Sequence, residues 1–343
     1  MTFMQSDVSK APSESLQPRQ NNAAQSVPNH RESAACWLTP GILAGFLSLT
    51  QLGMMLSLLA GRLGMAWVAP AALVLSLIGG DQAGRRMGLP GRWRLCVWGL
   101  AFGIMALAVG ISAYCYDLSF DGQWYHQVAV FQIARDWNPL AAPMRPHLIM
   151  WTPYFSKGPW YVAAAIYKTT GQIEWAKCTT WITWAAMVLA AFAAGLDWSL
   201  QRRQAAAIAL VIALHPVVTC EITAYLVDGI MAATLMLLVM AVFSAFRRPQ
   251  PVVVWVGIMA AILCANTKLN GLIYGCIVFA AGGLWCILRR REWLLRYSCL
   301  VFLALVLAVG VFGYNPYVTN TKYRHNPLFP AVGTDVLEKS QRY

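Results

Sequence analysis

Apolar stretches of about twenty residues recur along this chain, separated by short polar or charged connections. A helix of that length crosses a hydrocarbon core about 30 Å thick, because each residue adds about 1.5 Å of rise. The pattern therefore predicts an all-α fold, a polytopic transmembrane helix bundle of about nine spans. The predicted spans are 38–59, 64–80, 95–113, 175–196, 204–220, 228–246, 252–267, 271–288 and 297–314.

The remaining segments divide the chain into three parts. The first, 1–36, is rich in Ser, Gln, Asn and Pro, and we expect a disordered cytoplasmic tail. The second, 37–314, is the transmembrane domain, and it contains one long outer loop at 115–174. The third, 315–343, is predicted to be an extracytoplasmic C-terminal segment.

The long loop contains two further apolar patterns. Residues 123–137 place Trp124, Val128 and Phe131 on one helical stripe, which predicts an amphipathic helix lying on the outer leaflet. The apolar stretch 160–167 is too short to cross a membrane, so we expect it to lie along the interface as well.

Composition supports the membrane interpretation. Of 343 residues, 58% are hydrophobic and only 12% are charged, whereas a soluble domain carries roughly 25% charged residues. The chain therefore has too few charges to cover a water-facing surface. Its net charge of +12 reflects basic loops, and we read it as a sign of membrane topology with no nucleic-acid partner.

Arginines in short connections predict the orientation. Loops on the cytoplasmic side of a membrane carry an excess of Lys and Arg. In the nine-span arrangement, one side receives all four arginine-rich loops, with Arg85, Arg86, Arg92, Arg94, Arg202, Arg203, Arg247, Arg248, Arg289, Arg290, Arg291 and Arg296. We expect this side to be cytoplasmic, in a multi-pass protein of a bacterial-type inner (plasma) membrane, with the long loop on the extracytoplasmic face.

Apart from Asp197, the other polar residues near span ends gather on that outer face. They are Asp117, Asp121, His126, Arg145, Lys157, Glu174, Glu221, Asp228, Lys268 and Asn270. Ionisable groups at membrane depth are costly and usually functional. A mixture of acids and bases suits a reaction that needs a carboxylate base and a cation to stabilise an anionic leaving group.

Each of these residues also has a structural interpretation. Asp121 and Asp228 stand where helices are predicted to begin, so either could be an N-cap. Lys157 and Lys268 could extend to lipid headgroups, and His126 could serve only as a local hydrogen-bonding group. The nine cysteines form no CxxC pair and no Cys/His cluster, so the sequence indicates no cofactor or metal site, although a divalent metal is compatible with it.

Several short motifs, in a fixed order, resemble a known family. Asp121-Gly-Gln-Trp-Tyr125 opens the long loop, and Lys157-Gly-Pro-Trp-Tyr follows before a short helix. Asp228 then opens a later span, and a Thr-Lys268-Leu-Asn270-Gly turn follows. This order is similar to the GT-C class of membrane glycosyltransferases, in particular the protein O-mannosyltransferase and lipid A aminoarabinose transferase group (family 39-like).

The resemblance implies an inverting glycosyltransferase with a polyprenyl-phosphate sugar donor and a lipid, glycan or protein acceptor. Asp121 would be the catalytic carboxylate, with Tyr125 beside it, and Lys157 would contact the donor phosphate together with Lys268 or Arg145. Asp117, His126, Glu221, Asp228 and Asn270 are further candidate site residues.

The chain departs from the family at two points. Gly122 stands where relatives often have a second acid, which bears on metal dependence. Two spans precede the usual first one, and the later spans and outer C-terminal domain of many relatives are missing, so we expect a short relative or a fragment. Two other functions stay open: a transporter or flippase of the envelope, and a non-catalytic membrane subunit of a glycan-assembly complex.

Overall fold

The computed structural model describes residues 30–142 and 152–329, and within these ranges the chain is helical with no β-strand. The long helices are α2 (Leu38–Leu59), α3 (Met65–Arg86), α4 (Gly91–Tyr114), α7 (Cys178–Asp197), α10 (Asp228–Arg247), α11 (Pro251–Thr267) and α12 (Leu269–Arg289). The shorter helices are α1 (His30–Cys36), α5 (Gln127–Arg135), α6 (Gly158–Thr170), α8 (Arg202–Ala213), α9 (Pro216–Glu221), α13 (Leu294–Leu305) and α14 (Thr319–Arg324). Single-turn elements are η1 (Gly122–His126), η2 (Thr152–Tyr154), η3 (Glu174–Lys177), η4 (Arg291–Trp293), η5 (Val306–Val311) and η6 (Tyr314–Val318).

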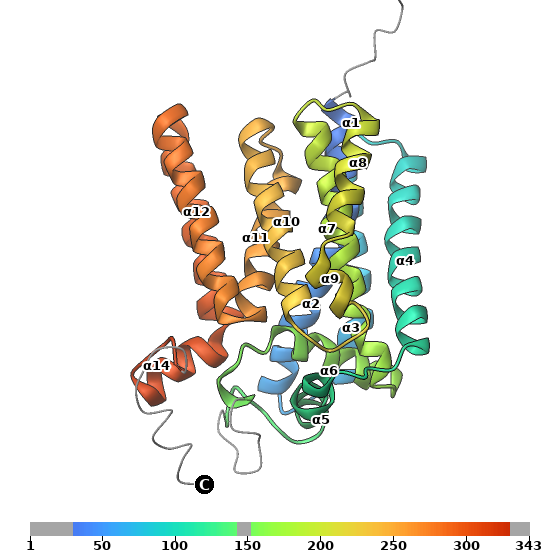
Figure 1. Cartoon of the computed structure of the whole chain (residues 1–343), viewed down its shortest axis with the longest axis vertical. Helices are drawn as coiled ribbons and strands as arrows, with labels where there is room; N and C mark the ends of the chain where they lie inside the picture. The colour runs from blue at the N-terminus through green and yellow to red at the C-terminus, as the bar shows by residue number, and fades with distance from the viewer. Residues whose placement is uncertain (1–29, 143–151, 330–343) are drawn as a thin grey trace, which may run out of the picture.

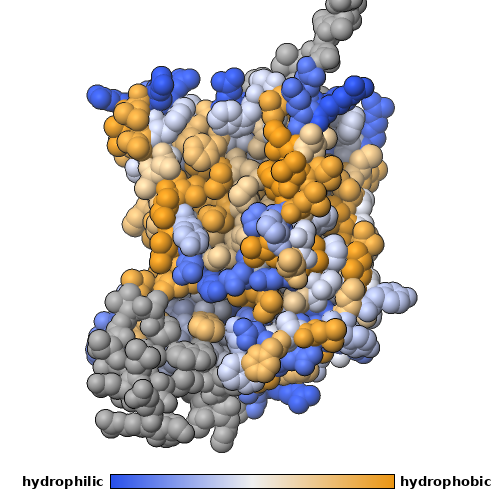
Figure 2. All heavy atoms as spheres, viewed as in Figure 1, coloured by the Kyte–Doolittle hydropathy of each residue, from blue (hydrophilic) through white to orange (hydrophobic). Residues whose placement is uncertain are grey.

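In the described parts of the chain, seven continuous helices are long and apolar enough to cross a membrane. They are Ser33–Leu59, Met65–Arg86, Gly91–Tyr114, Glu174–Asp197, Asp228–Arg247, Leu269–Arg289 and Arg291–Val311. The long helices run side by side, with α5, α6 and α14 at one end of the bundle and α1 at the other (Figure 1). A hydrophobic band separates two hydrophilic ends (Figure 2). The protein is therefore an all-helical, multi-pass membrane protein.

Two of the nine predicted spans are not among these seven, although the first of them, 252–267, is one continuous helix. Helix α11 has 17 residues, and the predicted span 204–220 is divided into α8 and α9 at His215. Pro216 causes this break, because proline has no N–H to donate and disfavours helical geometry at the residue before it.

Small residues let the helices pack closely. Gly195 of α7 faces α8, where an added Cβ would lie 2.8 Å from the Cβ of Ala205. Ala186, Ala190 and Ala193 of α7 are also fully or almost fully buried. Close backbone approach is the usual basis of helix association in lipid, since the surrounding acyl chains are as apolar as the side chains.

The helical part of the chain begins earlier than predicted. Residues His30–Cys36, assigned to a disordered tail, form α1. The reason is Asp197 at the end of α7, which is completely buried and accepts hydrogen bonds from Ser33 and from the Trp37 indole. A buried carboxylate needs such donors, and they come from this segment.

The two apolar patterns of the long loop have different surroundings. Helix α6 packs against α2, α3 and α5, and Trp160 to Ile166 are all buried, so this stretch is a core element where the sequence suggested an interfacial one. The predicted amphipathic helix comprises η1 and α5. Its Val130 and Ile133 side chains are buried towards the bundle, whereas Trp124 is half-exposed.

We predict that the α5–α6 end of the bundle is extracytoplasmic. With all nine native cysteines replaced, Ala141→Cys, which lies on the exposed surface at this end, should react with an impermeant thiol reagent in intact cells. Glu292→Cys, in an arginine-rich loop, is the matched control and should react only after permeabilisation. The opposite labelling pattern would show that the α5–α6 end of the bundle is cytoplasmic.

Candidate functional site

The candidate site begins in an extended segment that follows α4. Residues 115–119 alternate in direction, as extended backbone does, so Tyr116 and Leu118 are exposed while Asp117 between them is only 2% exposed. The carboxylate of Asp117 is therefore directed into the protein, where it requires hydrogen-bond donors.

Three donors satisfy the Asp117 carboxylate. Oδ1 accepts from the Ser119 backbone N–H at 2.8 Å and from the Ser119 hydroxyl at 2.6 Å. Oδ2 accepts from the backbone N–H of Tyr225 at 2.8 Å. Because Tyr225 lies in the turn between α9 and α10, Asp117 joins the long loop to the opposite part of the bundle. This is a structural role.

A second acid extends the connection. Glu174 accepts from the backbone N–H of Asp117 at 3.2 Å and forms an ion pair with Lys177, whose side chain is fully buried. Lys177 also donates to the carbonyl of Cys115, and the Tyr225 hydroxyl donates to the carbonyl of Ile173. The start of the loop is thus held from both sides.

The position of the Asp117 side chain explains why residue 122 is a glycine. A Cβ at this position would overlap the Asp117 carboxylate and the Ser119 hydroxyl. A second acid beside Asp121, as in many members of the resembled family, has no room here while Asp117 keeps its hydrogen bonds.

The structure brings charged residues from four elements together, since Asp121, Glu221 and Asp228 act on Tyr125 and Lys268 pairs with Asp228. Asp121 and Tyr125 come from the start of the amphipathic helix, Glu221 from the end of α9, Asp228 from the start of α10, and Lys268 from the start of α12. Burial raises the pKa of Tyr125 to about 12, and the negative charges of Asp121, Asp228 and Glu221 add to the effect. Tyr125 is therefore a neutral phenol at physiological pH, able to donate a hydrogen bond. We call these five residues the outer-face cluster, after the face on which the sequence predicts them to lie.

Two carboxylates of the cluster have partners. Asp228 forms an ion pair with Lys268 at 2.7 Å, and both side chains are 44% exposed. Glu221 accepts from the backbone N–H of Gly229 at 2.6 Å. Glu221 therefore caps α10, a role that the sequence suggested for Asp228. Burial raises the pKa of Glu221, and the hydrogen bond from Gly229 opposes that rise.

Asp121 differs from the other carboxylates. It stands at the N-cap position of η1 but makes no side-chain capping bond, and it is exposed. Among the residues that the structure describes, it has neither a hydrogen bond nor an ion pair. A carboxylate with free lone pairs is able to accept a proton from a bound hydroxyl group.

His126 lies behind the cluster in a buried position. Its Nδ1 accepts a hydrogen bond from the Trp160 indole at 2.8 Å, which requires a neutral ring. Burial lowers the pKa of His126 to about 4, although the charges of Asp117 and Asp228 act in the opposite direction. His126 thus connects α6 to the amphipathic helix, as a local hydrogen-bonding group.

The other predicted cations have different positions. Lys157 is 0% exposed, and its Nζ donates to the carbonyls of Pro153 at 2.7 Å and Phe155 at 2.6 Å. Burial lowers its pKa well below the usual value. In this conformation a phosphate cannot reach Lys157 unless residues 152–157 move, and its phosphate-binding role stays a prediction. Arg145 lies outside the described residues, and Asn270 is exposed in the first turn of α12.

An apolar groove of about 540 Å³ lies between α7 and the broken helix α8–α9. It is lined by Trp181, Trp184, Leu210 and Ile222 among others. Ile222 directly follows Glu221, so the outer end of the groove reaches the outer-face cluster along the chain. A groove of this size is within the range of about 300–1,000 Å³ that is common for ligand sites.

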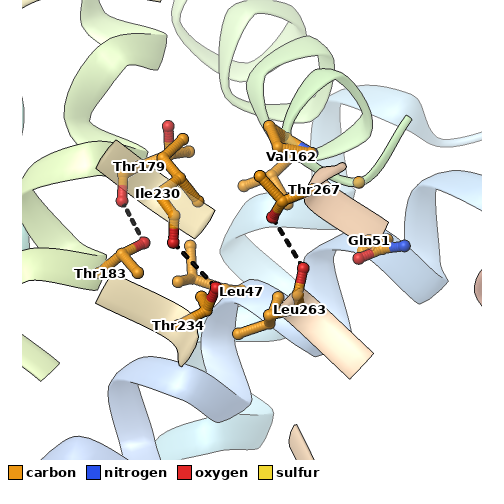
Figure 3. A pocket seen from close by; sticks show the side chains of 11 residues that line it. Leu47, Gln51, Val162, Thr179, Thr183, Ile230, Thr234, Leu263 and Thr267 are labelled. Carbon is orange, nitrogen blue, oxygen red and sulfur yellow. Dashed lines mark hydrogen bonds between the residues drawn. The ribbon is translucent and has the colours of Figure 1, made fainter. Parts of the chain in front are cut away.

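The centre of the bundle holds a much smaller pocket, of about 20 Å³ (Figure 3). Three of its lining threonines, Thr183, Thr234 and Thr267, donate to carbonyls of their own helices. The pocket has room for about one water molecule. Among the residues that the structure describes, no group of three or more His, Cys, Asp or Glu is placed to hold a metal ion.

Comparison with known proteins does not identify a relative. No protein-family model matches the chain, and neither the curated proteins nor the solved structures contain a match.

Sequence reasoning missed several residues that build the site. The loop is positioned by long-range contacts of Lys177, Tyr225 and Trp160. The spacing of residues along the sequence does not predict these contacts. One signal was available. A lysine three residues after Glu174, at the start of an apolar span, suggests a local ion pair.

Replacing Gly122 tests the contact with Asp117. Gly122→Ala should lower stability by about 1–3 kcal/mol, because the added methyl group displaces the buried carboxylate. Gly110→Ala is a matched control, since no heavy atom lies within 4 Å of its Cβ position. Thermal unfolding in detergent should show a loss for the first variant alone. Equal melting temperatures would contradict the placement of Asp117.

The neutral state of His126 predicts a pH dependence. Its folded pKa of about 4 lies below the unfolded value of about 6.5, so the unfolded state takes up the proton first. This contribution to stability is complete above pH 6.5 and is lost as the pH falls. Between pH 7 and pH 5 the loss should be roughly 2 kcal/mol.

His126→Asn keeps an acceptor for the Trp160 indole but does not titrate. The variant should therefore lose less stability than the parent over the same pH range, as measured by melting temperature in detergent. An identical pH dependence in the two proteins would show that His126 is not the group responsible.

Proposed function

We propose that this protein is an inverting glycosyltransferase that uses a polyprenyl-phosphate sugar donor at the extracytoplasmic face of a bacterial-type inner membrane. In this proposal the broken helix α8–α9 and the shorter α11 also cross the bilayer, which completes nine spans. The observation that carries the proposal is the free, exposed carboxylate of Asp121, which acts on Tyr125 together with Asp228, the partner of Lys268.

Each charged group has a defined task in this reaction. Asp121 removes the proton of the acceptor hydroxyl, and the resulting oxygen nucleophile attacks the anomeric carbon of the sugar. The bond between that carbon and the phosphate oxygen breaks, and the polyprenyl phosphate leaves with the electron pair. The ammonium of Lys268 stabilises the departing phosphate, since it has three N–H donors and Asp228 accepts one of them.

The surroundings support a lipid-linked donor. The groove between α7 and α8–α9 is almost entirely apolar and leads to residue 222, next to the outer-face cluster. A polyprenyl tail in this groove would supply binding energy away from the reacting atoms. The neutral phenol of Tyr125 can donate a hydrogen bond to the sugar or to the phosphate.

A transporter or flippase of the envelope and a non-catalytic membrane subunit are the other functions that the sequence leaves open. An assay with purified protein, a radiolabelled polyprenyl-phosphate sugar and a mixture of acceptors separates the functions. Transfer of label identifies a transferase, whereas a transporter or a non-catalytic subunit leaves the donor intact.

Asp121→Asn should lower turnover by roughly two or more orders of magnitude, because the amide has the size of the carboxylate but no basicity. Since Asp121 makes no contact that stabilises the fold in the described structure, the melting temperature should stay close to that of the parent.

Asp117→Asn is the matched control, four residues away in the same segment. It should lose stability by about 1–3 kcal/mol, because both carboxylate oxygens of Asp117 accept hydrogen bonds, whereas an amide has one accepting oxygen and an NH₂ group that can only donate. Parental turnover in the Asp121 variant would contradict the proposed base. An inactive but fully stable Asp117 variant would transfer that role to Asp117.

A further inference from the structure

A second cavity lies at the opposite end of the bundle from the outer-face cluster. Its volume is about 610 Å³, and it lies between α2, α3 and α11, with Leu307 and Phe312 at its inner end. Leu75 of α3 and Trp255 of α11 line the cavity and are also more than half exposed, so it opens sideways towards the lipid.

The depth of this cavity matches one leaflet. Along α2 its lining runs from Leu38 to Leu49, which corresponds to about 16 Å of helix. Half of a hydrocarbon core is about 15 Å. The walls are mainly apolar and include four glycines, Gly41, Gly45, Gly79 and Gly80, and at Gly79 an added Cβ would have no heavy atom within 4 Å. An acyl chain from the adjacent leaflet therefore fits its length and polarity.

The mouth of the cavity carries a positive charge. Arg86, in the last turn of α3, lines the cavity and is exposed. Its neighbours Arg85 and Arg94 both bind Asp81 at 2.6 Å. Arg86 has no such partner among the residues that the structure describes, so its guanidinium is available to an anion at the height of the headgroups.

A polar atom inside the cavity also lacks a partner. Ser48 is 5% exposed and lines the cavity, and its hydroxyl has no hydrogen bond. A glycerol ester or an acyl carbonyl that entered the cavity would supply an acceptor for this hydroxyl. An unpartnered buried hydroxyl costs about 1–3 kcal/mol, which favours a ligand that can accept a hydrogen bond from it.

We propose that this cavity binds one anionic diacyl phospholipid of the leaflet on the arginine side of the membrane. An acyl chain occupies the space between α3 and α11, and the headgroup phosphate accepts hydrogen bonds from Arg86. The site is distinct from the outer-face cluster, and it does not depend on the transferase chemistry.

The test is lipid retention by the full-length protein in native mass spectrometry, after incubation with equal amounts of phosphatidylglycerol and phosphatidylcholine with identical chains. The parent should retain one phosphatidylglycerol in preference to phosphatidylcholine. Arg86→Gln should lower that preference about fivefold, whereas Arg85→Gln, whose partner Asp81 keeps Arg94, should not.

A second pair of variants tests the location. Gly79→Leu adds a side chain in the cavity where no heavy atom lies within 4 Å, and leucine favours the helix, so the variant should fold but retain neither lipid. Gly99→Leu makes the same change in α4, also in open space and away from the cavity, and should retain the lipid.

Three outcomes would overturn the proposal. The parent could retain no lipid, or Gly79→Leu could retain as much as Gly99→Leu, which would place any bound lipid elsewhere. Equal losses in Arg85→Gln and Arg86→Gln would show a general effect of charge, with no headgroup contact at Arg86.

Discussion

The geometry of the outer face depends on one buried carboxylate. Asp117 is almost completely buried, and a carboxylate in such a place is tolerated only when donors surround it. Its donors come from Ser119 and from Tyr225, more than one hundred residues away in the chain. The long loop must therefore lie against the turn between α9 and α10, and Asp121 acts on Tyr125 together with Glu221 and Asp228.

This constraint also separates the roles of the acids. Asp117 and Glu221 satisfy backbone N–H groups, and Asp228 neutralises Lys268. In the described part of the chain Asp121 has no such partner, which is why we propose it as the base. Asp117 and Asp121 thus differ although they share one loop. The Asp117 side chain lies on the inward side of an extended segment, whereas Asp121 stands at the exposed start of a helix.

The membrane spans could be predicted from the sequence because length and hydrophobicity determine them locally. Seven were recovered as continuous helices, and the division at Pro216 was visible in principle from the proline itself. The burial of α6 and the start of α1 could not be predicted, since both depend on distant partners such as Asp197. The order of spans and loops in the sequence predicted that the charged residues lie at one end of the bundle. It could not show that Lys157 is enclosed while Lys268 is accessible, because that difference depends on tertiary packing.

The central claim is that the outer-face cluster binds the phosphate of a lipid-linked sugar. An experimental structure of the protein with a non-transferable polyprenyl phosphonate sugar tests this most directly. The account predicts the phosphonate within hydrogen-bond distance of Lys268, the sugar beside Asp121, and the tail in the groove between α7 and α8–α9. A phosphonate bound elsewhere in the molecule, with Asp121 and Lys268 free of ligand, would contradict it.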